Sequence, residues 1–202
     1  MSRPATKTHE ILALAREVGV LRPRDLASRG LPADLLPFLV RRGLMLRDER
    51  GLYVLSAAEV SEHHAVAMLA KRVPHGVICL ISALYFHDLG SQLPYETWMA
   101  IDPKAHLPRP GNSPFRIVRF SGEALGEGVE THVIEGVPVR IYGVAKTVVD
   151  CFKYRNKVGL DVALEALREF FNKRLGTVDD LWRYAEICRQ TNVMRPYLES
   201  LA

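Results

Sequence analysis

Residues 19–55 read GVLRPRDLASRGLPADLLPFLVRRGLMLRDERGLYVL, and this stretch decides the fold of the N-terminal part of the chain. The segment before it, residues 8–18, repeats apolar residues at helical spacing, and Gly19 is a typical residue just past a helix end. A second helix is predicted to begin at Pro23, because a proline in the first turn of a helix loses no hydrogen bond. Gly30 then supplies a turn before the next helix.

Pro37 limits where the third helix can begin. If the helix began at Pro32, Pro37 would lie in its interior and remove a backbone hydrogen bond. With Asp34 as the N-cap, Pro37 instead falls in the first turn, where the backbone N–H groups have no intrahelical partner. We therefore expect a short helix over about residues 35–42.

Two short strands are predicted at residues 44–47 and 52–55, on either side of a turn at residues 48–51. Three helices followed by a hairpin are the element order of a winged helix-turn-helix. That architecture places its third helix in the major groove of DNA. The sequence therefore predicts a DNA-binding domain over residues 1–57.

The rest of the chain, residues 58–202, is expected to form a second domain. Ser56 and Glu59 have the spacing of a capping box, so a helix is expected to begin there and to run to about residue 72. The segments that resemble strands are residues 97–101, 117–120, 132–135 and 137–142. Further helices are predicted at residues 78–89, 145–154, 162–173 and 178–190. The apolar stripe expected to be buried on the helix at 162–173 consists of Leu160, Leu164, Leu167 and Phe171. The predicted fold class is α+β, with a winged helix-turn-helix, then a mixed α/β domain that ends in a helical C-terminal third.

The basic charge of the chain is concentrated at its N-terminal end. Residues 1–57 carry ten Lys/Arg and six Asp/Glu, whereas residues 58–202 carry seventeen of each. Because contacts to phosphates need positive charge, this asymmetry favours a nucleic-acid ligand for the first domain. The residues predicted to contact DNA are Arg22, Arg24, Arg41, Arg42, Arg47 and Arg50, together with Arg3 and Lys7 on the N-terminal arm.

The predicted third helix has few side chains suited to reading bases. Its exposed positions include Pro37 and Phe38, whereas base recognition uses donors such as Arg, Asn or Gln. We therefore expect binding to depend mainly on phosphate contacts from Arg24, Arg41, Arg42 and the wing.

The sequence contains little that indicates catalysis. Asp88 and the segment Asp102-Pro103-Lys104 loosely resemble the acidic-x-Lys pattern of nucleases, in which carboxylates hold Mg²⁺ and a lysine orients water. Pro103 favours a turn there, so a metal-dependent nuclease is the lower-ranked alternative. The chain has no glycine-rich phosphate loop and no nucleophile elbow, and its histidines lack metal-ligand spacing. We expect a protein that is not an enzyme and has no cofactor and no metal.

The three cysteines, Cys79, Cys151 and Cys188, are far apart and form no CxxC pair. Their number and spacing predict buried, reduced thiols. The N-terminal residues MSRPATKTHE lack the apolar segment of a secretion signal, and the longest apolar stretch, residues 77–86, is too short to span a bilayer. The sequence therefore predicts a cytoplasmic protein with no membrane contact.

Segments along almost the whole chain resemble one family. In the N-terminal part they are RPRDLASRG, LVRRGL and RGLYVL. Further along they are HHAVAMLAKRVPHGVICLISAL, WMAID, RIVRFSG, EGVPVRIYGVAKTVVDCFKYRNKVGLDVALEAL and NVMRPYLE. In this order they resemble the AbiEi-type antitoxins of type IV toxin–antitoxin systems.

This resemblance implies a protein with two functions that serves phage defence. The winged helix would bind inverted repeats in double-stranded DNA at its own promoter and repress the operon. The C-terminal domain would counter a cognate nucleotidyltransferase toxin without forming a stable complex with it. The sequence leaves open an alternative, a stand-alone winged-helix transcriptional regulator whose second domain senses a ligand or a partner.

Overall fold

The computed structural model describes residues 4–48, 51–58, 60–109 and 113–200. Its N-terminal part, the winged-helix domain, comprises α1 (Pro4–Val18), α2 (Pro23–Ala27), α3 (Leu35–Arg41), β1 (Met45–Arg47) and β2 (Tyr53–Leu55). Strands β1 and β2 pair antiparallel, and Leu21, between α1 and α2, forms a further bridge with Tyr53. This is the element order of a winged helix-turn-helix, as the sequence predicted.

The winged-helix domain has a small hydrophobic core of its own. The core residues are Ile11, Leu14, Ala15, Leu21, Leu26, Leu36, Leu39, Met45 and Tyr53. Pro37 lies in the first turn of α3, where it displaces no helical hydrogen bond. Helix α1 begins earlier than the predicted residue 8, because its first turn has no apolar stripe that would reveal it in the sequence.

The second domain contains a five-stranded mixed sheet with helices on both faces. Its strands are β3 (Val77–Ile78), β4 (Thr97–Ile101), β5 (Phe115–Arg119), β6 (Val129–Ile134) and β7 (Val137–Tyr142), in the order β5-β4-β3-β7-β6. Its helices are α4 (His64–Arg72), α5 (Leu80–Phe86), α6 (Glu123–Gly126), α7 (Val144–Lys153), α8 (Arg155–Val158), α9 (Leu160–Asn172), α10 (Val178–Ile187) and α11 (Thr191–Glu199). Together with the winged helix, these elements confirm the predicted α+β fold class with a helical C-terminal region.

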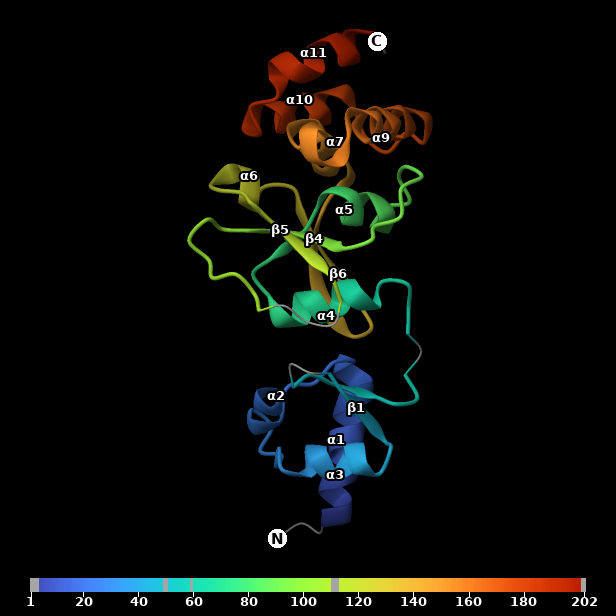
Figure 1. Ribbon diagram of the computed structural model, residues 1–202, viewed down its shortest axis with the longest axis vertical. Coiled ribbons are helices and arrows are strands. Elements are labelled where there is room, and N and C mark those ends of the chain that lie inside the picture. The colour runs from blue at the N-terminus through green and yellow to red at the C-terminus, as the bar shows by residue number, and fades with distance from the viewer. Residues whose placement is uncertain (1–3, 49–50, 59, 110–112, 201–202) are drawn as a thin grey trace.

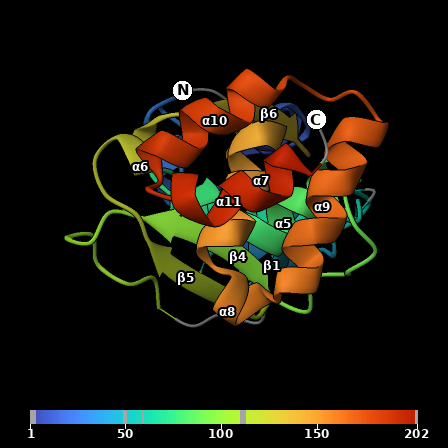
Figure 2. The same cartoon turned by 90° about the horizontal axis from the view of Figure 1, so that it is seen from above.

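The helices of the second domain form two layers around the sheet. Helix α4 lies on the side that faces the winged-helix domain, whereas α5 and the C-terminal helices lie on the opposite side (Figure 1). Seen from that end, α7, α9, α10 and α11 cover the sheet (Figure 2). Alternate residues of β4 accordingly enter different cores, with Trp98 and Ala100 facing the C-terminal helices and Met99 and Ile101 facing α4. None of the helices in the described parts of the chain is both long and apolar enough to cross a membrane.

Three predictions about the second domain were wrong. The helix expected from Ser56 begins only at His64, and the described residues before it, 56–58 and 60–63, are not helical. Glu59 of the expected capping box lies outside the described residues. The helix predicted at residues 78–89 is a short strand, β3, followed by α5, because a buried central strand shows the same continuous apolar run as a buried helix. Leu160, expected on the buried stripe of α9, is 39% exposed, and the buried face is shifted to residues such as Val162, Ala166 and Phe170.

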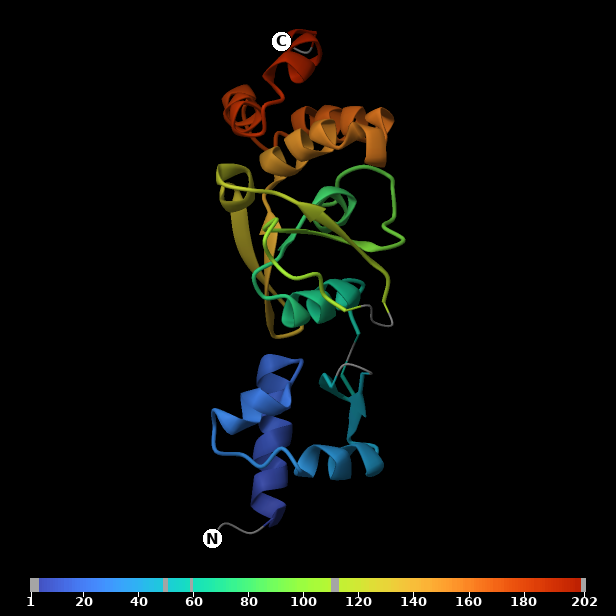
Figure 3. The same cartoon turned by 60° about the vertical axis from the view of Figure 1, so that its left-hand side comes forward.

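The turn between β6 and β7 packs against the end of α1 and so forms a contact between the two domains. Gly19, at the end of α1, has φ +65°, and a Cβ atom at this position would lie 1.4 Å from the carbonyl oxygen of Glu135. Gly136, with φ +75°, also meets the end of α1, because a Cβ atom at this position would lie 2.7 Å from the carbonyl carbon of Val18. Figure 3 shows this end of the hairpin directly above the C-terminal end of α1. The backbones therefore meet at two glycines, and no larger residue fits at either position.

Side chains add to this junction on both sides. Val20 and Leu52 of the winged-helix domain belong to the hydrophobic cluster that packs between α4 and the sheet. Lys71, near the end of α4, forms an ion pair with Asp25 of α2 at 2.9 Å, and both side chains are mostly buried. The junction thus combines backbone contact, apolar packing and a cross-domain ion pair.

Candidate nucleic-acid interface

Helix α3 has one buried and one exposed side. Leu36 and Leu39 are fully buried in the core of the winged-helix domain. The exposed side carries Pro37, Phe38, Arg41 and Arg42. The helix lies at the end of its domain that is furthest from the second domain, as Figures 1 and 3 show from two directions. This side of α3 is therefore open to a large ligand such as a DNA duplex.

Two arginines at the C-terminal end of α3 supply the positive charge of this surface. Arg41 is exposed, and its side chain makes no hydrogen bond or ion pair within the described parts of the chain. The guanidinium of Arg42 lies 5.3 Å from the ring centroid of Phe38, which orients it along the helix without neutralising it. Neither guanidinium has a carboxylate partner among the described residues, so both are available to phosphates or to guanine edges.

The wing, the hairpin formed by β1 and β2, does not continue the exposed surface of α3. Strand β1 leads from the α3 end of the domain towards the second domain (Figure 3). Arg47 is exposed on β1, with its guanidinium 5.8 Å from the centroid of Tyr53. Arg47 and Asp48 line a cleft together with residues of α4 and with Phe115. The arginine of the wing thus faces the domain junction and lies apart from Arg41 and Arg42.

Arg22 and Arg24 also lie at the junction. They line a second cleft, in which Arg72 at the end of α4 and Arg109 of the loop after β4 face them across the domain boundary. The sequence predicted Arg22 and Arg24 as DNA contacts but missed Arg72 and Arg109, because nothing in the local pattern around either residue reveals a partner so distant in the chain.

The remaining predicted contacts are not placed on the α3 surface. Lys7 is half-buried in the N-terminal part of α1. Arg3 and Arg50 lie outside the described residues. The eight predicted residues are therefore not a single group: two lie on α3, three at the domain junction and one on α1.

The residues that suggested a nuclease form a local turn. One carboxylate oxygen of Asp102 accepts a hydrogen bond from the backbone N–H of Lys104 at 2.7 Å. Asp88 belongs to a different segment, just after α5, and the ammonium group of Lys173 donates a hydrogen bond to its backbone carbonyl at 2.6 Å. No group of three or more His, Cys, Asp or Glu side chains placed to hold a metal ion is found within the described residues.

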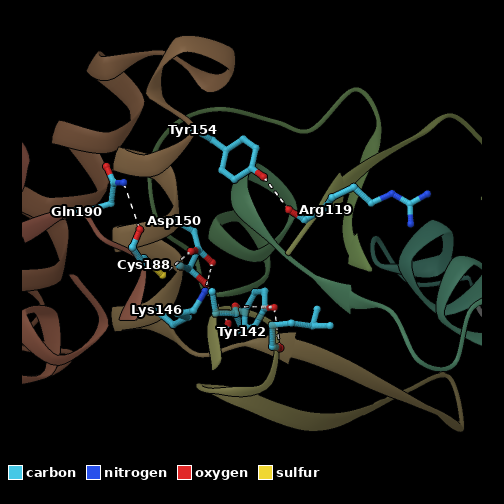
Figure 4. A network of polar contacts seen from close by, with 10 residues as sticks. Arg119, Tyr142, Lys146, Asp150, Tyr154, Cys188 and Gln190 are labelled. Carbon is cyan, nitrogen blue, oxygen red and sulfur yellow. Dashed lines mark hydrogen bonds and ion pairs between the residues drawn. The ribbon is translucent and has the colours of Figure 1, made fainter. Parts of the chain in front are cut away.

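A buried ion pair lies in the helical C-terminal region. Lys146 and Asp150, both on α7 and both fully buried, form an ion pair at 2.5 Å. The ammonium of Lys146 also lies 4.1 Å from the ring centroid of Tyr142, and the thiol of Cys188 donates to Asp150 at 3.4 Å (Figure 4). The sequence contains the i, i+4 spacing of this pair, but its burial depends on the helices that pack around α7.

Burial decides the protonation of the groups around this pair. It raises the pKa of the Asp150 carboxyl, an effect that the charge of Lys146 opposes. It also raises the pKa of Cys188 to about 11, and it raises those of the fully buried Cys79 and Cys151. The three thiols are therefore protonated at neutral pH and poor nucleophiles, and the prediction that they are buried is confirmed.

Glu135 ties the connection between the domains to the β6–β7 turn. One of its carboxylate oxygens accepts hydrogen bonds from the backbone N–H and the hydroxyl of Ser61, both at 2.8 Å. The other oxygen contacts Nδ1 of His64 at 2.6 Å. These bonds occupy the backbone N–H of Ser61, which in the predicted helix capped at Ser56 would instead bond to the carbonyl of residue 57. Burial alone would raise the pKa of Glu135, but the hydrogen bonds from His64 and Ser61 outweigh it and hold the pKa below the ordinary value of 4.5.

We predict that this site weakens in acid. A carboxyl group whose pKa is lower in the folded than in the unfolded protein stabilises the fold above its unfolded pKa and loses this effect as the pH falls. Thermal unfolding of the wild type and of Glu135→Gln is therefore expected to show a higher Tm for the wild type at pH 7. The difference should shrink below about pH 4.5. A Glu123→Gln control, which removes an exposed carboxylate, should show no such pH-dependent difference. Equal Tm values for the wild type and Glu135→Gln at pH 7 would contradict the prediction.

Comparison with known proteins supports the fold of this chain. No protein-family model matches it, and no curated protein matches it. Among solved structures, it is similar to the crystal structure of the RV2827C protein from Mycobacterium tuberculosis, with a TM-score of 0.61 and 14% sequence identity. The similarity covers 92% of this chain and 73% of that protein. At this identity the likeness shows that the two chains share a fold that includes both domains.

Proposed function

We propose that this chain is a DNA-binding antitoxin of the AbiEi type, which represses its own operon and counters a nucleotidyltransferase toxin. The observation that carries the DNA-binding part is the exposed side of α3, where Arg41 and Arg42 project from a winged helix at the end of the molecule. The antitoxic part rests on the resemblance of the segments between residues 63 and 199 to that family.

The exposed side of α3 favours contacts to the DNA backbone over base recognition. Besides the two arginines it presents Pro37 and Phe38, which supply no hydrogen-bond donors to base edges. Arg41 and Arg42 would grip phosphates beside the groove, and sequence preference would come from these two residues and from the shape of the DNA.

We expect Arg41→Ala combined with Arg42→Ala to weaken binding to the upstream region of the chain's own gene by at least about tenfold, because two charge-assisted contacts are lost. Fluorescence anisotropy with a labelled promoter duplex measures the loss. The control is Arg29→Ala combined with Arg183→Ala, which removes two exposed arginines that are paired with Glu17 and Glu127. If the control weakened binding as much as the α3 variant, the α3 surface would not be the site.

The same double variant separates the two proposed functions. Expressed from an unrelated promoter together with the nucleotidyltransferase encoded beside the gene, it should still rescue growth, since the antitoxic effect is assigned to the second domain. Failure of both the wild type and the variant to rescue growth would reject the antitoxin assignment and leave a transcriptional regulator.

A further inference from the structure

A cleft of about 590 Å³ lies between the two domains. On the winged-helix side it is lined by Arg22, Pro23, Arg24, Gly51 and Leu52, and on the other side by Arg72, Pro108 and Arg109. It is separate from the exposed side of α3, which lies at the far end of the winged-helix domain (Figure 1). Its size falls within the range typical of small-molecule sites, which often form where domains meet.

The lining of this cleft is strongly positive. Four of its described lining residues are arginines, two from each domain, and none is acidic. The nearby carboxylate of Asp25 is already engaged, since it accepts a hydrogen bond from the backbone N–H of Arg22 and pairs with Lys71, both at 2.9 Å. The positive charges of Arg22, Arg24 and Arg109 repel one another across this cleft, and a bound anion would relieve that repulsion.

Arg22 gives an independent sign of a missing acceptor. Its Nη2 atom is buried and has no hydrogen-bond partner within the described parts of the chain. Buried polar groups in folded proteins are almost always hydrogen-bonded, so an orphaned N–H on a guanidinium whose residue lines the cleft points to an acceptor that a bound ligand would supply. An anionic acceptor suits the arginines that line this cleft.

The far wall of the cleft is held in place before any ligand binds. Arg72 donates a hydrogen bond to the backbone carbonyl of Arg109, which ties the loop after β4 to the end of α4. Arg119 braces the start of the same loop by donating to the carbonyls of Asp102 and Ala105, at 2.5 and 2.7 Å. A wall fixed in this way limits the entropy lost when an anion binds.

We propose that this cleft binds the phosphate groups of a small phosphorylated molecule, such as a nucleotide. Guanidinium groups match phosphate oxygens in geometry as well as in charge, because each can donate two parallel hydrogen bonds. Arg22 and Arg24 would hold the phosphates from the winged-helix domain, and Arg72 and Arg109 from the second domain. A ligand held by both pairs links the two domains and so strengthens their junction.

Titration of inorganic pyrophosphate into the full-length protein, followed by calorimetry and by thermal unfolding, tests the proposal. The wild type should bind pyrophosphate, and its Tm should rise with ligand concentration. Arg24→Met combined with Arg109→Met removes one exposed arginine from each wall and should weaken binding at least about tenfold. Arg29→Met combined with Arg183→Met lowers the net charge equally outside the cleft and should bind as the wild type does.

Two further measurements separate this site from the α3 surface and identify the source of the phosphate. Arg41→Ala combined with Arg42→Ala should keep pyrophosphate binding even where promoter binding is lost. Pyrophosphate binding that persists on protein saturated with the promoter duplex supports a small ligand. If the duplex instead displaces pyrophosphate from the wild type, and Arg24→Met with Arg109→Met also weakens DNA binding, the phosphates come from the DNA backbone.

The proposal is overturned if the wild type does not bind pyrophosphate, or if the cleft variant and the matched control bind it equally well. Arg22→Met provides a check that does not depend on affinity. Because it removes the orphaned N–H group, it should not lower the Tm in phosphate-free buffer, yet it should reduce the rise in Tm caused by pyrophosphate. A full ligand-induced rise in this variant would also contradict the proposal.

Discussion

Replacing Lys146 by methionine is expected to lower the free energy of unfolding by about 3–5 kcal/mol at neutral pH, which corresponds to a fall in Tm of roughly 6–20 °C. The substitution removes the charge that faces Asp150 at 2.5 Å in a fully buried site. Among the described residues, the only other side chain that donates to this carboxylate is that of Cys188, and a thiol is a weak donor. The variant therefore leaves a buried carboxylate almost without stabilising contacts.

If the loss of stability comes from the unpaired charge on Asp150, it should depend on pH and should be reversed by a second substitution. In Lys146→Met, burial raises the pKa of Asp150 against only the smaller opposing effects of Cys188 and Lys153, so the variant should recover stability relative to the wild type as the pH falls and the carboxyl group takes up a proton. Replacing both residues, as Lys146→Met with Asp150→Leu, should restore most of the loss, because no buried charge remains. Denaturant unfolding of the three proteins measures the effect. A single variant within 1 kcal/mol of the wild type would contradict this account.

Gly19→Ala is expected to separate the winged-helix domain from the β6–β7 turn. The residue has φ +65°, a conformation that alone costs alanine about 1–2 kcal/mol. The added Cβ would also lie 1.4 Å from the carbonyl oxygen of Glu135, and backbone on both sides leaves no side chain that can move aside. We therefore expect a lower Tm together with faster proteolysis of the connection at residues 56–63.

Gly30 provides the matched control for this substitution. It has nearly the same backbone angle, φ +66°, but a Cβ atom there would meet nothing within 4 Å. Gly30→Ala should therefore show the backbone strain without the domain separation, and the connection should be cleaved at the wild-type rate. If the two variants behaved alike, the close contact at Gly19 would not hold the domains together.

Local chemistry predicts the parts of the fold that depend on neighbouring residues. Pro37 and Asp34 place the start of α3 correctly, because the constraints of proline act within a single turn. Strand β7 was predicted with its observed bounds, since residues 137–141 alternate between buried and more exposed positions. The start of α4 was missed because it depends on Glu135, which is 74 residues away from Ser61.

Of the two candidate sites, one could be predicted from the sequence and the other could not. Arg41 and Arg42 follow from the sequence, because a winged helix exposes the end of its third helix. The cleft at the domain junction does not, because it unites arginines from residue 22 to residue 109 through tertiary packing.

The most direct test of the central claim, that the α3 surface binds DNA, is the salt dependence of promoter binding. For the wild type, the logarithm of the association constant should fall linearly with the logarithm of the salt concentration, by about 0.9 per phosphate contact. Arg41→Ala with Arg42→Ala should bind more weakly and give a slope shallower by about 2, because two phosphate contacts are lost. A double variant with the affinity and slope of the wild type would contradict the claim.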